Sequence, residues 1–289
     1  MKRLKKRGNQ SKNWKGLVAG FIGFTVALIL ISWLFRGIKA SQWDGQSQFG
    51  WVIQAEEIQV KIIIPNQKKL ITLIIPDNTM VQVGFGFGEY RINKVYELGK
   101  LENQAGKVLT RTVQELLGVG IKGWQAGTKS NLSWWDKVRI KWLEVLAVNQ
   151  TEEIELKDKA AWQAEHLSDA SLVYRVNQVW LDELVHQEIF DQEISQEGLT
   201  VAVLNASGVD GVANNIGRLI SNLGIEVRLV SNLAVQDQSE VVISQKSLKD
   251  TKTLKKIVDS LGIGTIRVDD ILEYRSDVVV IIGRDYANL

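Results

Sequence analysis

The sequence of 289 residues contains no cysteine, and only two histidines and two prolines. Without cysteine the chain can form no disulfide, no thiolate nucleophile and no cysteine-ligated zinc or iron–sulfur site. Only His166 and His186 could serve a histidine-dependent triad, and their polar surroundings predict surface positions. The Gly-x-Ser-x-Gly nucleophile motif is absent. The chain therefore offers few of the side chains that catalytic sites use.

Positive charge is concentrated at the N-terminus. Residues 1–16 hold seven bases and no acid, whereas the residues beyond Lys39 hold 26 bases against 33 acids. A nucleic-acid-binding face needs clustered positive charge. The acidic bulk of the chain therefore argues against nucleic acid as a partner, and the sixteen residues of the basic tail are too few to form a DNA-reading domain.

Leu17–Phe35 is a run of 19 residues without a charge. A helix of this length spans roughly 28 Å, which matches the hydrocarbon thickness of a bilayer. The alternatives are a cleaved signal peptide and a buried helix. The run is longer than a signal-peptide core, no A-x-A-like cleavage site follows it, and it is apolar all round. We therefore expect a signal-anchor helix in a lipid bilayer, and the bases before it place the N-terminus in the cytoplasm and the bulk of the chain outside.

Hydrophobic periodicity predicts the elements of the remaining chain. Residues 36–55 are rich in Gly, Ser and Gln and are predicted to form a tether. The next elements are strands at 58–62, 70–75 and 80–83, a glycine-rich loop at 84–88 and a helix at 106–117. After residue 198 the predicted order is strand 199–204, helix 212–223, strands 225–230 and 240–245, helix 251–261, and strands 265–268 and 278–282. This order indicates a compact α/β sandwich.

A further helix is predicted to begin at Ser133, because Asp136 follows three residues later as in a capping box. Its apolar residues share one face, namely Trp135, Val138, Trp142, Val145 and Leu146. A helix that combines tryptophan with lysine can lie on a membrane surface. The commoner arrangement, which we expect here, turns the apolar face toward the protein core.

The C-terminal segments Val203–Gly208 (VLNASG), Gly211–Ala213 (GVA) and Ser276–Tyr286 (SDVVVIIGRDY) resemble the LytR C-terminal domain of bacterial cell-envelope proteins. The resemblance covers roughly residues 199–287. It implies a membrane-anchored envelope protein, and the family is tied to no firm reaction.

The turn after the first strand of this region is a candidate binding site. It leads into a helix N-terminus, where backbone N–H groups can hold an anion. The candidate anion- or glycan-binding residues are Asn205, Ser207, Gly208 and Gly211. Ordinary turn chemistry is the alternative that we favour.

The middle of the chain carries Ile75–Thr79 (IPDNT), Arg91–Gly99 (RINKVYELG) and Thr112–Val119 (TVQELLGV). These segments are similar to a shortened, divergent LytR-CpsA-Psr domain. The resemblance implies transfer of glycopolymers from a polyprenyl pyrophosphate carrier to peptidoglycan, with arginines and acids around a pyrophosphate and a metal. The family pattern is Ile-Pro-Arg-Asp-Thr, so Asp77 replaces an arginine that grips phosphate.

Four residues remain as candidate ligand- or phosphate-binding positions: Glu56, Asp77, Arg91 and Asn93. Glu56 stands where the family has an acid, and Arg91 where it has a base. Because the family-type arginine is missing, we expect no catalysis and no cofactor. The alternative is a residual glycopolymer phosphotransferase that uses these residues with Mg²⁺ on a polyprenyl pyrophosphate-linked substrate.

The sequence thus predicts an α/β (α+β) protein with a single transmembrane helix and two small extracytoplasmic α/β domains. The expected parts are a basic cytoplasmic tail (1–16), the anchor (17–35), the tether (36–55), a LytR-CpsA-Psr-like domain (56–190), a linker (191–198) and a LytR C-terminal-like domain (199–289). We expect a cell-membrane protein that binds or scaffolds cell-wall glycopolymer, peptidoglycan, lipid-linked precursor or an envelope protein. No pattern bears on its oligomeric state.

Overall fold

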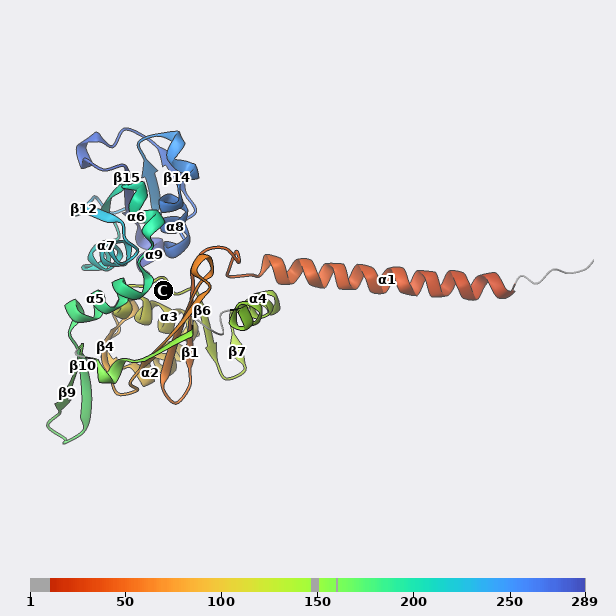
Figure 1. The fold of residues 1–289 in the computed structure, drawn as a ribbon, viewed down its shortest axis with the longest axis horizontal. Helices are drawn as coiled ribbons and strands as arrows, with labels where there is room; N and C mark the ends of the chain where they lie inside the picture. The colour runs from red at the N-terminus through yellow and green to blue at the C-terminus, as the bar shows by residue number, and fades with distance from the viewer. Residues whose placement is uncertain (1–10, 147–150, 160, 289) are drawn as a thin grey trace, which may run out of the picture.

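The computed structural model describes residues 11–146, 151–159 and 161–288. Ser11–Lys39 forms one helix of 29 residues, α1, which projects away from the rest of the protein (Figure 1). Val18–Lys39 contains an 18-residue window with a mean hydropathy of 2.3, and no residue of that window is buried in the protein. The prediction of an apolar N-terminal helix is therefore confirmed, and its length and composition suit a membrane span. Residues 1–10 of the basic tail lie outside the described residues.

Within the described residues, six strands form a mixed sheet in the order β7-β6-β1-β2-β3-β8. They are β1 (Phe49–Gln54), β2 (Ile58–Ile64), β3 (Lys69–Ile75), β6 (Gly123–Ala126), β7 (Lys129–Ser130) and β8 (Thr151–Glu155). β1, β2 and β3 pair antiparallel, while β6 joins β1 and β8 joins β3 in parallel. The predicted strands over 58–62 and 70–75 are confirmed, and the second lies inside the sheet as its apolar sequence suggests.

Two hairpins extend from this region. One pairs β4 (Met80–Val83) with β5 (Gly88–Arg91), and the glycine-rich segment 84–88 forms the turn between them. The other pairs β9 (Trp162–His166) with β10 (Leu172–Val176). His166 is exposed at the end of β9, as the sequence predicted.

The segment predicted as a tether is largely structured, so that prediction is wrong. α1 continues to Lys39, and residues 49–54 form the buried strand β1. Trp43, Phe49 and Trp51 pack together with ring centroids 5.4 and 6.0 Å apart. The Gly, Ser and Gln content masked a six-residue strand that pairs with β2, which follows it directly, and with the distant β6.

Helices cover both faces of the six-stranded sheet. α2 (Ile92–Leu101), α3 (Ala105–Leu117) and α5 (Gln178–Ile189) share one apolar core with alternate residues of β2 and β3. α4 (Trp134–Leu146) lies against the other face, where Ile140 joins a smaller core with Phe49, Trp51 and Ile63. The predicted capping box is confirmed, because Asp136 N–H donates to Ser133 Oγ and Ser133 N–H donates to Asp136 Oδ2.

The predicted orientation of α4 is wrong. Val138, Trp142, Val145 and Leu146 are exposed, whereas Ile140 is buried and Leu143 packs beside it. The helix therefore has two apolar sides, and the narrower one faces the protein. Periodicity alone cannot show which of two apolar stripes faces a core.

The C-terminal part contains a second sheet in the order β12-β11-β15-β13-β14. Its strands are β11 (Thr200–Asn205), β12 (Glu226–Asn232), β13 (Glu240–Ile243), β14 (Ile266–Val268) and β15 (Val278–Ile282). The helices of this part are α6 (Gln192–Glu197), α7 (Val212–Asn222), α8 (Lys252–Leu261) and α9 (Arg284–Ala287). The predicted elements agree with these within two residues, and the whole is a mixed α/β structure.

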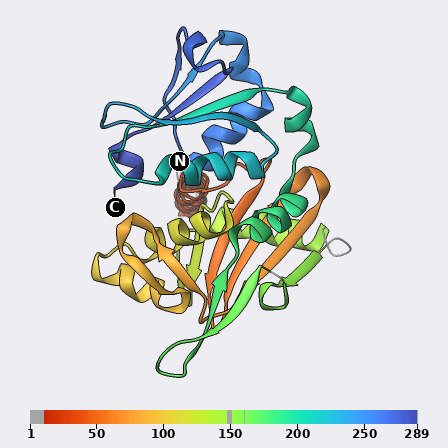
Figure 2. The same cartoon turned by 90° about the vertical axis from the view of Figure 1, so that its left-hand side faces the viewer.

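The two sheets are connected through helices that lie between them (Figure 2). The apolar side chains of α3, α5, α7 and α8 belong to one continuous core. α7 also closes the C-terminus of α3, because Arg218 Nη2 donates to the carbonyl oxygens of Glu115 and Leu116 at 2.6 and 2.9 Å. Asn222 Nδ2 donates to the carbonyl of Gly118 at 3.1 Å. These bonds satisfy carbonyls that a helix end leaves without partners.

Candidate functional site

The turns at one end of the six-stranded sheet bring three of the four predicted middle-site residues together. Glu56 lies in the β1–β2 turn and Asp77 in the β3–β4 turn, and both line one open hollow of about 610 Å³. Asn93, in the first turn of α2, donates its backbone N–H to the Asp77 carbonyl at 3.2 Å, and its Nδ2 lies 3.5 Å from Asp77 Oδ2. The Asn93 side-chain oxygen is buried and has no hydrogen-bond partner among the described residues.

Arg91, the fourth predicted residue, is directed elsewhere. Its Nη2 donates to Ser171 Oγ at 2.7 Å, and it is not among the residues that line the hollow. Hydrogen bonds from Ser171, supported by the Arg91 charge, lower the pKa of Asp169 below its ordinary value. Arg91 thus holds the hairpin between β9 and β10, rather than the hollow.

The charge of this hollow is unsuited to a bare pyrophosphate. Its described lining residues include Glu56, Glu57 and Asp77 and no cation. The pyrophosphate and these carboxylates are both negatively charged, so a metal ion would have to bridge them for the pyrophosphate to bind. Within the described part of the chain, no group of three His, Asp or Glu side chains could hold such an ion. Mg²⁺ needs only one or two protein carboxylates when it also binds substrate phosphates, so Glu56 and Asp77 remain the candidate ligands of the phosphotransferase alternative.

The predicted C-terminal residues form a closed turn. Asn205 Oδ1 accepts hydrogen bonds from the Ser207 N–H and Oγ at 3.1 and 2.6 Å, and Asn205 Nδ2 donates to the Val209 carbonyl at 2.8 Å. Gly208 and Gly211 have φ values of 77° and 79°, a region that favours glycine. Both polar side chains are buried and occupied by the turn itself, which agrees with ordinary turn chemistry.

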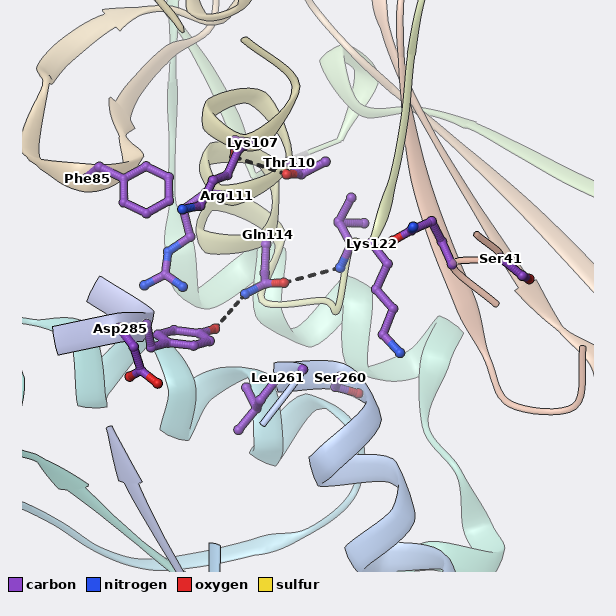
Figure 3. Close-up of a pocket in the computed structure, with 14 residues that line it drawn as sticks. Ser41, Phe85, Lys107, Thr110, Arg111, Gln114, Lys122, Ser260, Leu261 and Asp285 are labelled. Carbon is purple, nitrogen blue, oxygen red and sulfur yellow. Dashed lines mark hydrogen bonds between the residues drawn. The ribbon is translucent and has the colours of Figure 1, made fainter. Parts of the chain in front are cut away.

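A third cleft, which sequence reasoning missed, lies between α3, α8 and α9 (Figure 3). Its volume is about 470 Å³, and its walls include Lys107 and Arg111 of α3, Lys122, and Asp285 and Tyr286 of α9. Three cations thus converge on one cleft against a single lining carboxylate. The cations come from residues 107–122 and the opposite wall from residues near the C-terminus, so no local motif could reveal the arrangement.

Buried polar contacts fix the walls of this cleft. Gln114 Nε2 donates to the Tyr286 hydroxyl at 2.9 Å, and Gln114 Oε1 accepts from the Ile121 N–H at 3.3 Å (Figure 3). The Arg111 guanidinium lies 4.2 Å from the Tyr286 ring centroid and pairs with Glu115 at 2.6 Å. Burial raises the pKa of Tyr286, so this residue is a neutral wall at physiological pH.

The three cations of the cleft differ in their exposure and in their ion pairing. Lys122 pairs with Asp259 at 3.0 Å, and Arg111 is 9% exposed. Lys107 is exposed, with its Nζ 5.3 Å from the Phe85 ring centroid. Phe85 comes from the glycine-rich turn and has a φ of 64°. Its ring lies beside the N-terminal half of α3 (Figure 3). Lys107 is therefore the cation best placed to meet a ligand from solvent.

Comparison with known proteins agrees with the sequence resemblance. Residues 198–286 match the family model described as LytR cell envelope-related transcriptional attenuator, the LytR C-terminal domain. This match confirms the domain predicted over 199–287. No curated protein sequence matches the chain.

Solved structures of LytR-CpsA-Psr proteins are similar to the N-terminal part of the chain. TagT of Bacillus subtilis is 12% identical, with a TM-score of 0.40, over 49% of this chain and 89% of its own. YwtF (TagT) with bound octaprenyl pyrophosphate lipid is 13% identical, with a TM-score of 0.39, over 48% and 88%. A transcriptional regulator of Enterococcus faecalis is 11% identical, with a TM-score of 0.40, over 62% and 89%.

Proposed function

We propose that this protein is a membrane-anchored, extracytoplasmic cell-envelope protein that binds an anionic cell-wall glycopolymer or its lipid-linked precursor without transferring it. In this proposal α1 spans the membrane with the N-terminus in the cytoplasm. The six-stranded sheet and the LytR C-terminal domain then form two extracytoplasmic domains, joined near residues 191–198. The length and hydropathy of α1 support its role as a membrane anchor. The match to the LytR C-terminal family model supports the assignment to the cell envelope.

The observation that carries the binding role is the contrast between the two sites. The hollow at Glu56 and Asp77 presents carboxylates, whereas the cleft in Figure 3 is lined by Lys107, Arg111 and Lys122. Arg111 and Lys122 are paired with carboxylates, so the exposed Lys107 is the cation offered to a ligand. Phosphate-rich polymers are attracted to convergent cations and repelled by carboxylates. We therefore assign binding to the cleft, and we expect no phosphoryl transfer at the hollow.

Binding to purified anionic wall glycopolymer, measured by microscale thermophoresis on the full-length protein in detergent, tests this proposal. Lys107→Ala should weaken binding by about five- to tenfold, since one charge-assisted contact contributes on the order of 1 kcal/mol. Lys129→Ala, which removes an exposed lysine from β7, is the matched control. Equal losses for both variants would indicate binding through overall charge, and no binding to the wild type would refute the assignment.

A further inference from the structure

The outward side of α4 is a continuous apolar surface without a covering element among the described residues. It consists of Val138, Trp142, Val145 and Leu146, which are 49, 68, 64 and 52% exposed. Val138, Trp142 and Val145 lie on one helix face because they are three, four or seven residues apart, and Leu146 follows Trp142 by four residues. We call them the outer face of α4. A face of this size and hydrophobicity on a globular protein marks an interaction site.

The helix that carries this face is fixed against the base of α1. The rings of Trp33 and Trp134 stack with centroids 4.4 Å apart and planes at 5°. Gly37, one turn further along α1, makes this contact possible, because a methyl group there would overlap the Trp134 indole. The contact joins the end of the apolar run in α1 to the first residue of α4.

Polar contacts reinforce the same junction. The buried Asp136 carboxylate accepts hydrogen bonds from Ser41 Oγ and from the Gln42 N–H, the latter at 3.0 Å. Arg139 Nη1 donates to the Trp43 carbonyl at 2.5 Å. The chain that leaves α1 is therefore tied to the first two turns of α4, and the distance between α4 and the end of the apolar run is set by these contacts.

The position of α4 follows from this junction. α4 lies on the side of the protein from which α1 projects (Figure 1). Trp33 is two residues from the end of the apolar run Leu17–Phe35, so a bilayer around that run has its interface near Trp33. The Trp33–Trp134 stack then holds the start of α4 at the level of the interface.

The side chains around the outer face match such an interface. Lys137 and Lys141 are exposed along one edge of it, whereas Arg139, along the other edge, is half-buried and bound to the Trp43 carbonyl. Lysine and arginine can extend to lipid headgroups while their stems cover apolar surface, and tryptophan prefers the headgroup boundary. A helix with an apolar face, tryptophan and basic flanks is the pattern of helices that lie in a membrane interface.

We propose that α4 lies in the interface of the bilayer that α1 spans, with its outer face against the lipid. This inference rests on the proposed membrane anchoring. The membrane then holds the protein at two elements, α1 and α4, and restricts its rotation about the anchor. The six-stranded sheet, which packs on the inner side of α4, is thereby held close to the membrane surface.

The absence of cysteine makes site-directed spin labelling a direct test. Full-length single-cysteine variants carrying a nitroxide are reconstituted in vesicles of phosphatidylcholine and phosphatidylglycerol. Val145→Cys reports on the outer face, Leu28→Cys on α1, and Leu272→Cys on a residue 82% exposed between β14 and β15. The measurement is the collision rate of each label with oxygen, which concentrates in lipid, and with a nickel chelate, which stays in water.

The expected result is a deep lipid signature at position 28, an aqueous signature at 272, and a shallow lipid signature at 145. An aqueous signature at 28 would overturn the anchor itself. A lipid signature at 28 with an aqueous one at 145 would overturn the proposal for α4 and leave the anchor standing. Dipolar broadening of the spectrum at position 145 would show a second copy of the protein on this face if dilution with unlabelled protein removes the broadening. That result would also overturn the proposal for α4. Circular dichroism confirms that each variant is folded.

Discussion

Replacing Lys256 with methionine should raise the stability of the protein at pH 7. Lys256, on α8, is 8% exposed, and its Nζ donates to Gln48 Oε1 at 2.7 Å. Burial lowers the pKa of this ammonium group to about 8, although Asp191 and Asp259 oppose the shift. The folded state therefore holds a proton on Lys256 less tightly than the unfolded chain does.

The sign of the pH dependence follows from proton binding in the two states. Below pH 8 both states are protonated, and the cost of the buried charge is present in full. Between about pH 8 and 10.5 the unfolded state binds more protons, so the free energy of unfolding rises with pH. A difference of about 2.5 pKa units corresponds to about 3 kcal/mol. The lost hydrogen bond to Gln48 offsets about 1 kcal/mol, which leaves about 2 kcal/mol of stabilisation for Lys256→Met at pH 7.

Urea unfolding of the full-length protein in detergent, followed by tryptophan fluorescence, measures this effect at pH 7 and pH 10. The advantage of Lys256→Met should be present at pH 7 and largely lost at pH 10. Lys255→Met, at the exposed neighbouring position, should show neither the gain nor the pH dependence. A Lys256→Met variant that is less stable than wild type at pH 7 would refute the reasoning, because it would mean that the partners of the buried charge outweigh its desolvation.

Three further changes test other parts of the structure. Asp136→Ala removes a fully buried carboxylate that caps α4 and binds the chain leaving α1, so it should lower the free energy of unfolding by about 2–4 kcal/mol in the same urea assay. Arg218→Ala removes the bonds that close α3 at Glu115 and Leu116, and should cost about 2–3 kcal/mol by the same measurement. Asp77→Arg places the family-type arginine at the acidic hollow, and should increase the thermal shift caused by a short-chain polyprenyl pyrophosphate; an unchanged shift would show that this residue does not limit binding.

Local sequence patterns predicted much of the fold. Helix α3 shows its apolar spacing and ends at Gly118, whose φ of 63° fits a left-handed cap. β11 and β15 are short, mostly apolar runs that are buried along their whole length, as expected for strands inside a sheet. β1 was missed because the Gly, Ser and Gln residues around it favoured a tether, although its antiparallel partner β2 follows it directly.

The candidate site was less accessible to sequence reasoning. Glu56, Asp77 and Asn93 were identified through a resemblance, and the turns of the sheet do place them together. The basic cleft depends instead on Arg111 of α3 lying over the ring of Tyr286 of α9. Such a juxtaposition comes from the packing of helices between two sheets, which no spacing rule describes. The apolar face of α4 was identified from the sequence but its orientation was not, because periodicity cannot show which of two apolar stripes meets the core.

The most direct test of the proposed function is a transfer assay on the full-length protein in vesicles. The protein is incubated with polyprenyl pyrophosphate-linked glycopolymer, peptidoglycan and Mg²⁺, and release of polyprenyl phosphate is followed while glycopolymer binding is measured in parallel. A binding protein without catalysis predicts bound polymer and no release above the protein-free control. Release above that control would contradict this account and establish the phosphotransferase instead.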